Sequence, residues 1–287
     1  MNAEASSPVQ DEIARIERDA KQAVKRRWQL VYFLRIAILV AILGGWELAG
    51  RMKWIDPFFY SMPSDIWGQL HTWFTEGTAQ GPLWQQVLVT LEETTYGFLI
   101  GSVLGVICGI VLGRNRFLAD VFSIYIKVAN SIPRVVLGSI FIIALGLGMA
   151  SKVALAVVMV FFVVFANAFQ GVREADRNLL SNAYILGASH RQVTFSVVVP
   201  SAMSWILASL HVSFGFALVG AVVGEFLGSR QGIGLMIATA QGSFNAAGVF
   251  AAMIVLAVVA LAAEYLLTHL ENILLKWRPP QFMEQGH

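Results

Sequence analysis

The sequence predicts an all-α integral membrane protein with six transmembrane helices, an amphipathic N-terminal segment and a polar elbow between two of the helices. Composition is the first reason, because 57% of the residues are hydrophobic and only 13% are charged, against about 25% charged in soluble domains. The mean hydropathy of +0.67 points the same way. The second reason is that several apolar runs exceed the ~18 residues that suggest a membrane-spanning helix.

The N-terminal segment, residues 1–27, is polar and carries six basic residues between Arg15 and Arg27. Apolar residues recur weakly among them at helical spacing. Two interpretations stay open here. The segment is either a helix on the cytoplasmic membrane surface, drawn to anionic lipid, or a solvated charged tail.

A single transmembrane domain is expected over residues 28–278, followed by a tail at 279–287. The six expected spans are residues 28–49, 85–113, 118–145, 153–169, 202–226 and 249–275. Pro133 should kink or split the third span, because proline removes a backbone hydrogen bond. Ser151 and Lys152 are expected in a short turn before the fourth span. Residues 228–245 are too short and too rich in glycine to cross, which favours a half-helix dipping back into the protein.

Glycines recur every four residues along the second span. They are Gly97, Gly101, Gly105, Gly109 and Gly113, and the fifth span repeats the device with Gly220 and Gly224. This spacing aligns positions without side chains on one helix face, so a neighbouring helix can approach closely. The pattern predicts tight helix packing and says little about function.

The longest polar interruption between the two hydrophobic halves is the elbow, residues 174–200. Leu179, Ala183 and Leu186 make an apolar stripe on a first short helix. Gly187 is placed to end that helix. A capping box of Ser189 and Gln192 should start a second one, which Pro200 should end. An elbow of two helices hinged at a glycine suggests a handle for a partner protein.

The basic residues predict the orientation. With both termini in the cytoplasm, thirteen basic residues of the tail, the loops and the C-terminal end lie inside, and four lie outside, namely Arg51, Lys53, Lys152 and Arg230. This places the elbow in the cytoplasm.

Several charged residues fall in or near the apolar runs, where an ionised group costs a few kcal/mol or more unless it faces a polar cavity or a partner. The candidates for a translocation pathway are Lys127, Arg134, Glu92 and Glu225. The two cations would suit an anion. The alternatives are a buried ion pair with a glutamate or simple snorkelling of the long side chains.

The sequence lacks the common chemical motifs of enzymes. The sequence has no phosphate-binding loop of the G-x-x-x-x-G-K-[ST] type, no H-E-x-x-H and no G-x-S-x-G. Its one cysteine, Cys108, excludes a cysteine-based zinc cluster. The net charge of +2 gives no support to a nucleic-acid partner. We therefore expect no enzyme activity, no metal site and no cofactor on this chain.

The elbow resembles the cytoplasmic motif of permease subunits from bacterial ABC importers. That motif is Glu-Ala-Ala, three residues, Gly, nine residues, then Ile-x-Leu-Pro. The glycine falls on Gly187 and the proline on Pro200, and Ser181, Asn182 and Ala183 take the first three positions, so the leading Glu and Ala are replaced. Residues 131–148, 197–210 and 222–252 are similar to the nitrate/sulfonate/taurine group, and the resemblance covers about residues 30–278.

The resemblance implies a type I importer permease in the bacterial inner membrane. Two permease copies, most simply a homodimer, would form the pathway for a small solute such as nitrate, a sulfonate, taurine or an aromatic acid. Two separate subunits would bind ATP and magnesium, and a periplasmic or lipid-anchored solute-binding protein would deliver the solute. The elbow residues expected to dock the ATP-binding subunit are Ser181, Asn182, Ala183, Tyr184, Gly187, Ala188 and His190. The alternative is a self-sufficient secondary transporter or channel.

Overall fold

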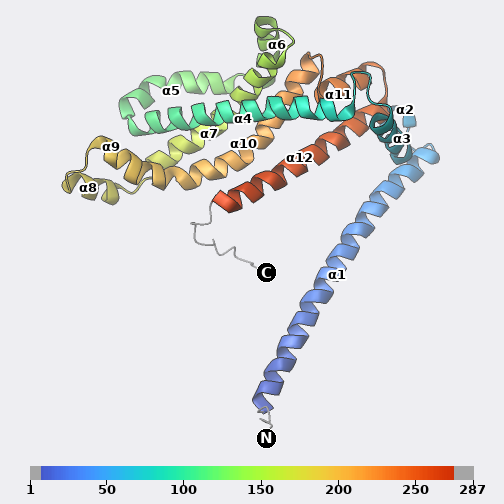
Figure 1. Cartoon of the computed structure of the whole chain (residues 1–287), viewed down its shortest axis with the longest axis horizontal. Coiled ribbons are helices and arrows are strands. Elements are labelled where there is room, and N and C mark those ends of the chain that lie inside the picture. The colour runs from blue at the N-terminus through green and yellow to red at the C-terminus, as the bar shows by residue number, and fades with distance from the viewer. Residues whose placement is uncertain (1–7, 275–287) are drawn as a thin grey trace. The chain divides into compact units, whose positions relative to one another are not determined.

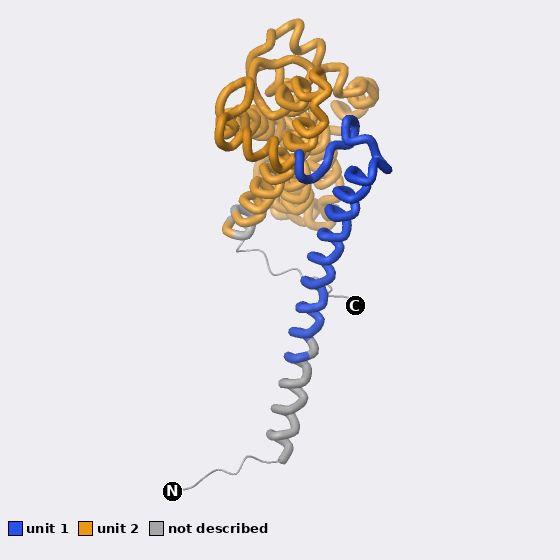
Figure 2. Tube along the Cα trace, turned by 90° about the vertical axis from the view of Figure 1, so that its right-hand side faces the viewer, with its two compact units in different colours: residues 1–65 blue, residues 66–287 orange. Residues whose placement is uncertain are grey.

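A computed structural model of the protein describes residues 8–274, so the predicted tail at 279–287 lies outside the described residues. The regular structure of the described part is helical. The chain divides into two compact units, Met1–Asp65 and Ile66–His287, which Figure 2 colours separately.

The first unit is built around the long helix α1 (Pro8–Arg51), followed by the single turn α2 (Pro57–Tyr60). The boundary predicted after residue 27 falls inside α1, whose segment Val24–Arg51 is apolar enough to cross a membrane. Glu47 ties the end of this unit together. Its carboxylate accepts hydrogen bonds from the backbone N–H and the hydroxyl of Ser64 and pairs with Arg51 at 2.7 Å.

The second unit is organised around three long apolar helices, α4 (Leu83–Arg114), α7 (Met149–Arg173) and α10 (Val199–Leu227). α7 lies in the centre and packs along both α4 and α10, which Figure 1 shows as neighbouring ribbons. Val160 and Val164 of α7 meet Ala217 of α10 in a buried cluster between them.

The third predicted span is split. It consists of α5 (Arg116–Ser131) and α6 (Arg134–Leu145), which meet at an angle of 89° around Pro133. This confirms the break predicted from the proline, which cannot donate the backbone hydrogen bond that a continuous helix needs. α6 packs against α7 and stands away from α4 in Figure 1.

Parts of three other helices meet at one end of the second unit. They are α3 (Pro63–Thr75), α11 (Ile233–Gly242) and α12 (Ala246–Leu274). α11 has ten residues, in agreement with the half-helix predicted within 228–245, and it packs against α12 and α10. Leu83, Ile233, Met236, Ala252 and Val255 form the buried cluster at this end.

In all, five described helices are long and apolar enough to cross a membrane, and counting the bent α5–α6 pair as one span gives six. The count agrees with the six predicted spans. Ser151 and Lys152, predicted to lie in a turn, instead belong to the first turn of α7, which begins at Met149.

Candidate functional site

The elbow begins where α7 ends at Arg173. Its first helix, α8 (Arg177–Ile185), is capped by Asp176, whose carboxylate accepts the backbone N–H of Asn178 at 2.7 Å. The helix ends at Gly187, which has a φ of +83°. The N–H of Ala188 donates to the carbonyl of Ala183, and that of Gly187 donates to Tyr184, both at 3.0 Å. This is the Schellman termination, and it confirms the predicted stop.

The second elbow helix is α9 (His190–Val193), and its predicted capping box is present. The Ser189 hydroxyl accepts from the N–H of Gln192, and the Gln192 side-chain oxygen accepts from the N–H of Ser189 at 2.8 Å. Both ends of the hinge are therefore closed by local hydrogen bonds. Such a hinge has few free backbone groups and a defined angle.

The predicted end at Pro200 is wrong, because α9 continues through a π-helical turn, η1 (Thr194–Val198), directly into α10. The helical stretch from His190 to Leu227 is unbroken. A π turn relaxes the helix just where a proline ring would crowd the carbonyl four residues earlier. The hydroxyl of Ser201 donates to the carbonyl of Val197 at 2.7 Å, which supplies one hydrogen bond beside the proline. The elbow is thus a direct extension of a membrane span.

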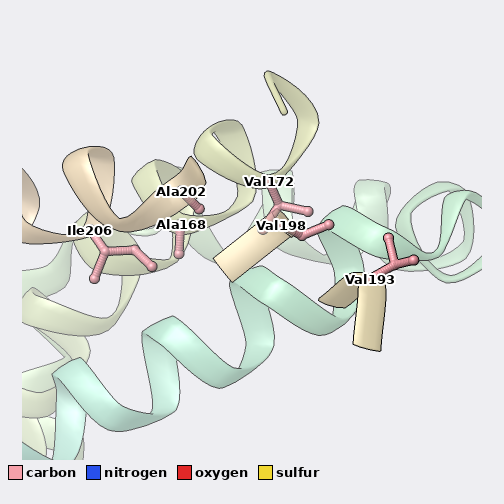
Figure 3. Close-up of a cluster of buried hydrophobic side chains, with 6 residues drawn as sticks. All are labelled: Ala168, Val172, Val193, Val198, Ala202 and Ile206. Carbon is pink, nitrogen blue, oxygen red and sulfur yellow. The ribbon is translucent and has the colours of Figure 1, made fainter. Parts of the chain in front are cut away.

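A buried apolar cluster fixes the elbow to the bundle (Figure 3). It joins α7, α9, η1 and α10 through Ala168, Val172, Val193, Val198, Ala202 and Ile206. Leu180 and Ala183 of α8, and Ala188 at the hinge, pack against it. Because these side chains belong to both elbow helices and to two spans, the cluster joins the elbow directly to the ends of α7 and α10.

The stripe predicted on α8 is only partly correct. The face turned toward the bundle carries Leu180 and Ala183, whereas Leu179 is exposed. Ile185 and Leu186 at the tip are 82% and 85% exposed. The sequence reasoning missed these two as site residues, although two large apolar residues beside a helix-ending glycine were a visible signal. Ile185 and Leu186 therefore form an exposed apolar tip beside the hinge.

The predicted docking residues flank Ile185 and Leu186 in the sequence. Ser181, Asn182, Tyr184 and His190 are exposed. The hydroxyl of Tyr184 lies 2.9 Å from Nδ1 of His190 across the hinge, and Nη2 of Arg114 at the end of α4 approaches the same oxygen at 3.4 Å. Tyr184 therefore links both elbow helices to the end of α4.

The glycines predicted for packing all lie against α7. On α4 they follow α7 from Ala156 to Val172, and a Cβ added at Gly101 would stand 2.8 Å from the carbonyl oxygen of Val157. On α10, Gly220 meets the backbone of Ala156, and Gly224 leaves room for the side chain of Lys152. The three spans nearest the elbow are thus in close backbone contact.

The predicted pathway residues occupy different surroundings. Lys127 and Glu92 are exposed on the described unit. Arg134 is half-buried, donates to Oδ1 of Asn130 at 2.6 Å and lies over the ring of Phe162. These three side chains are available to a cavity or a second subunit, but they do not come together in this chain.

The fourth pathway candidate, Glu225, is completely buried. Its carboxylate accepts hydrogen bonds from the hydroxyl of Thr90 at 2.7 Å and from the N–H of Gly234 at 2.6 Å. Glu93 and Lys152 are buried nearby, and Nζ of Lys152 donates to the carbonyl of Leu147 at 2.6 Å. These hydrogen bonds join the carboxylate of Glu225 to α4 and to the start of α11.

These contacts hold the start of α11 between α4 and α10. Glu225 accepts the N–H of Gly234, Thr90 accepts that of Ile233 at 3.0 Å, and Gln86 accepts that of Gly232 at 2.8 Å. The first N–H groups of a helix have no acceptor within the helix. Side chains of α4 and α10 therefore accept these hydrogen bonds. Gly232 has a φ of +109°, and a Cβ there would collide with Glu225.

Comparison with known proteins identifies the chain. The family model described as "Binding-protein-dependent transport system inner membrane component" matches residues 101–275, which include the elbow, the π turn and α11. The chain belongs to this family of ABC importer permeases. Among solved structures, an inward-facing MetNI methionine ABC transporter chain aligns with a TM-score of 0.58 at 18% identity, covering 68% of this chain and 94% of that one. At that identity the match supports the fold alone.

Curated relatives of this permease span nearly its whole length. A putative aliphatic sulfonates transport permease of Bacillus subtilis is 30% identical over 90% of this chain and 91% of its own. A formylaminopyrimidine transport permease of Halalkalibacterium halodurans is 27% identical over 90% of this chain and all of its own. The taurine transport permease of Escherichia coli is 27% identical, with 88% of this chain and 94% of its own covered. The permease thus falls in the predicted sulfonate and taurine group.

Proposed function

We propose that two copies of this permease form the pathway of an ATP-driven importer, and that the elbow, residues 174–200, carries the surface gripped by the ATP-binding subunit. The observation that carries the proposal is the bare apolar tip, Ile185 and Leu186, on a hinge closed by hydrogen bonds. Large apolar side chains at the centre of an interface contribute most when they are fully covered on binding. A partner that buries both residues would therefore bind the elbow tightly.

The mechanical connection to the spans supports a coupling role. The cluster around Val172 and Val198 joins the elbow to α7 and α10, and the glycine contacts join α7 to α4. Closely packed interiors move as units and switch between discrete arrangements. When the ATP-binding subunits close, a displacement of the tip would be transmitted to α4, α7 and α10, because direct packing, and not flexible loops, joins the elbow to these spans.

The orientation follows the basic residues. Arg114 and Arg173 end α4 and α7 at the elbow, and Arg116 begins α5 there. Lys152 is one of the four basic residues that the sequence assigns to the outside. Because it is buried, it is not counted among the basic residues of the loops. With the elbow end in the cytoplasm, the magnesium and ATP of the partner subunits lie on that side. A periplasmic or lipid-anchored binding protein would deliver the solute on the other.

For the solute we propose a small organic or inorganic anion. The relatives' names include aliphatic sulfonates and taurine, both of which carry a sulfonate group. Arg134 holds a half-buried guanidinium fixed by Asn130 and Phe162, and Lys127 lies exposed on α5, before the break at Pro133. Cations near broken helices are suited to polar cavities in membrane proteins.

The test combines docking and uptake. Replacing both tip residues by alanine (Ile185→Ala with Leu186→Ala) should sharply lower the amount of ATP-binding subunit that co-purifies, and should lower solute uptake in parallel. The matched control is Leu261→Ala, which removes a bare leucine from α12 (67% exposed) and should change neither. Normal uptake by the double variant, at an equal membrane level, would refute the proposal. A chain that transports without any ATPase would favour a secondary carrier instead.

A further inference from the structure

A small pocket opens between the elbow and the ends of three spans. Its volume is about 260 Å³, below the ~300–1,000 Å³ typical of pockets for drug-sized ligands. The lining comes from the ends of α4 and α7, the start of α5, α8 and the π turn: Gly113, Arg114, Arg116, Val172, Arg173, Leu180, Tyr184 and Val198, with Ala175 between α7 and α8. The space suits a compact polar group.

All the charged residues that line the pocket are positive. Arg114, Arg116 and Arg173 come from three different helices and line the same space. Among the described residues, no carboxylate oxygen lies within 4.0 Å of these guanidinium groups. The two acidic neighbours of Arg173 are occupied elsewhere, since Glu174 accepts from the side chain of Gln170 and Asp176 caps α8. Within the part of the chain that the structure describes, the three cations therefore have no carboxylate partner.

Two of the arginines have fixed positions. Arg173 lies over the ring of Phe169, with its guanidinium 5.3 Å from the ring centre, and Arg114 approaches the Tyr184 hydroxyl. Basic residues that only mark the cytoplasmic side can spread along the membrane surface. Here they converge on a walled space that also contains a tyrosine hydroxyl, which is an arrangement expected of a binding site.

We propose that this pocket binds a phosphate group, carried either by an anionic lipid headgroup or by a small soluble phosphate. Guanidinium groups donate paired hydrogen bonds that match the oxygens of a phosphate. The Tyr184 hydroxyl, which contacts Nδ1 of His190 and Nη2 of Arg114, lies on the lining of the same pocket. A phosphate would supply the negative charge that no described carboxylate supplies to the three arginines.

Occupancy would act on the elbow. Leu180 and Tyr184 belong to α8, and Val198 belongs to the π turn that leads into α10. A phosphate held by Arg114, Arg116 and Arg173 would join these parts to the ends of α4, α5 and α7. The bound group then stiffens the connection through which the ATP-binding subunit moves the spans.

The test measures binding to the full chain by native mass spectrometry, with phosphatidylglycerol and glycerol 1-phosphate as separate probes and phosphatidylcholine as the neutral reference. Preferential retention of phosphatidylglycerol indicates a lipid source, and equal binding of glycerol 1-phosphate indicates a soluble one. Arg116→Gln with Arg173→Gln should lower the affinity for the probe at least about tenfold, since each basic residue adds substantially to the attraction. This pair leaves the Arg114–Tyr184 contact in place.

The control is Lys53→Gln with Arg230→Gln, which removes the same charge from two residues that do not line the pocket and should change the affinity less than about twofold. Arg116→Lys with Arg173→Lys keeps the charge and should lose part of the affinity, which separates a folding defect from loss of the site. Three results would overturn the proposal: no binding of either probe, an equal loss in the control pair, or displacement of the probe when the ATP-binding subunit docks.

Discussion

The glycine contacts between α4 and α7 give the sharpest prediction about the fold. The change is Gly101→Ala together with Gly109→Ala. A Cβ at Gly101 would lie 2.8 Å from the carbonyl oxygen of Val157, and one at Gly109 would lie 2.9 Å from that of Phe165. Both obstacles are backbone atoms, so no side-chain rotation relieves them. The two helices must move apart.

The expected magnitude follows from these contacts. Overfilling a packed interface costs about 1–3 kcal/mol per site. The two glycines are eight residues apart, which is about 12 Å along a helix, so their costs should roughly add. The double variant should therefore lose about 2–6 kcal/mol of the free energy of unfolding. Close packing carries much of helix association in lipid, where burial of apolar surface adds little.

The assay is unfolding by SDS titration in mixed micelles, followed by far-ultraviolet circular dichroism. The control is Gly215→Ala in α10, because a Cβ there meets no atom within 4 Å. Alanine is favoured over glycine in helices by up to about 1 kcal/mol, so the control should be neutral or more stable. A double variant within about 0.5 kcal/mol of the parent would show that the close approach of α4 to α7 is incorrect.

Three further substitutions test local devices by the same titration. Thr90→Val removes the donor to Glu225 and the acceptor for the N–H of Ile233, and should cost about 1–3 kcal/mol, whereas Thr90→Ser should cost much less; equal losses would contradict the anchor. Gly187→Ala should cost about 1 kcal/mol, because alanine is strained at a positive φ and no neighbour crowds the site; an unchanged midpoint would argue against the left-handed hinge. Ser189→Ala should cost about 0.5–2 kcal/mol through loss of the cap, and Ser189→Thr should retain most of it.

Much of the architecture could be predicted because it depends on local patterns. Pro133 splits the third span, Gly187 ends α8 and Ser189 starts α9, and each effect follows from the backbone of one or two residues. The glycine repeat likewise fixes which face of α4 packs, since only that face lets another helix approach. The family resemblance added the partners, which no local pattern contains.

The features that the sequence could not supply concern residues whose surroundings depend on distant parts of the chain. Pro200 is typical of a helix end, but the π turn before it lets the helix continue. Glu225 is an ionisable residue in a span, and only the fold brings Thr90 and the start of α11 to its carboxylate. The exposed tip at Ile185 and Leu186 depends on which face of α8 meets the bundle. Sequence periodicity on so short a helix leaves that face open.

The central claim is that the ATP-binding subunit grips the elbow and moves the spans through it. The direct measurement attaches a photoactivated benzophenone to Leu186→Cys in a Cys108→Ser background, with Leu261→Cys as the control position, in membranes that contain the assembled importer. Illumination should join the elbow cysteine to the ATP-binding subunit and stop uptake. The control cysteine should give neither effect. Absence of that product from Leu186→Cys, or full uptake after it has formed, would contradict the account.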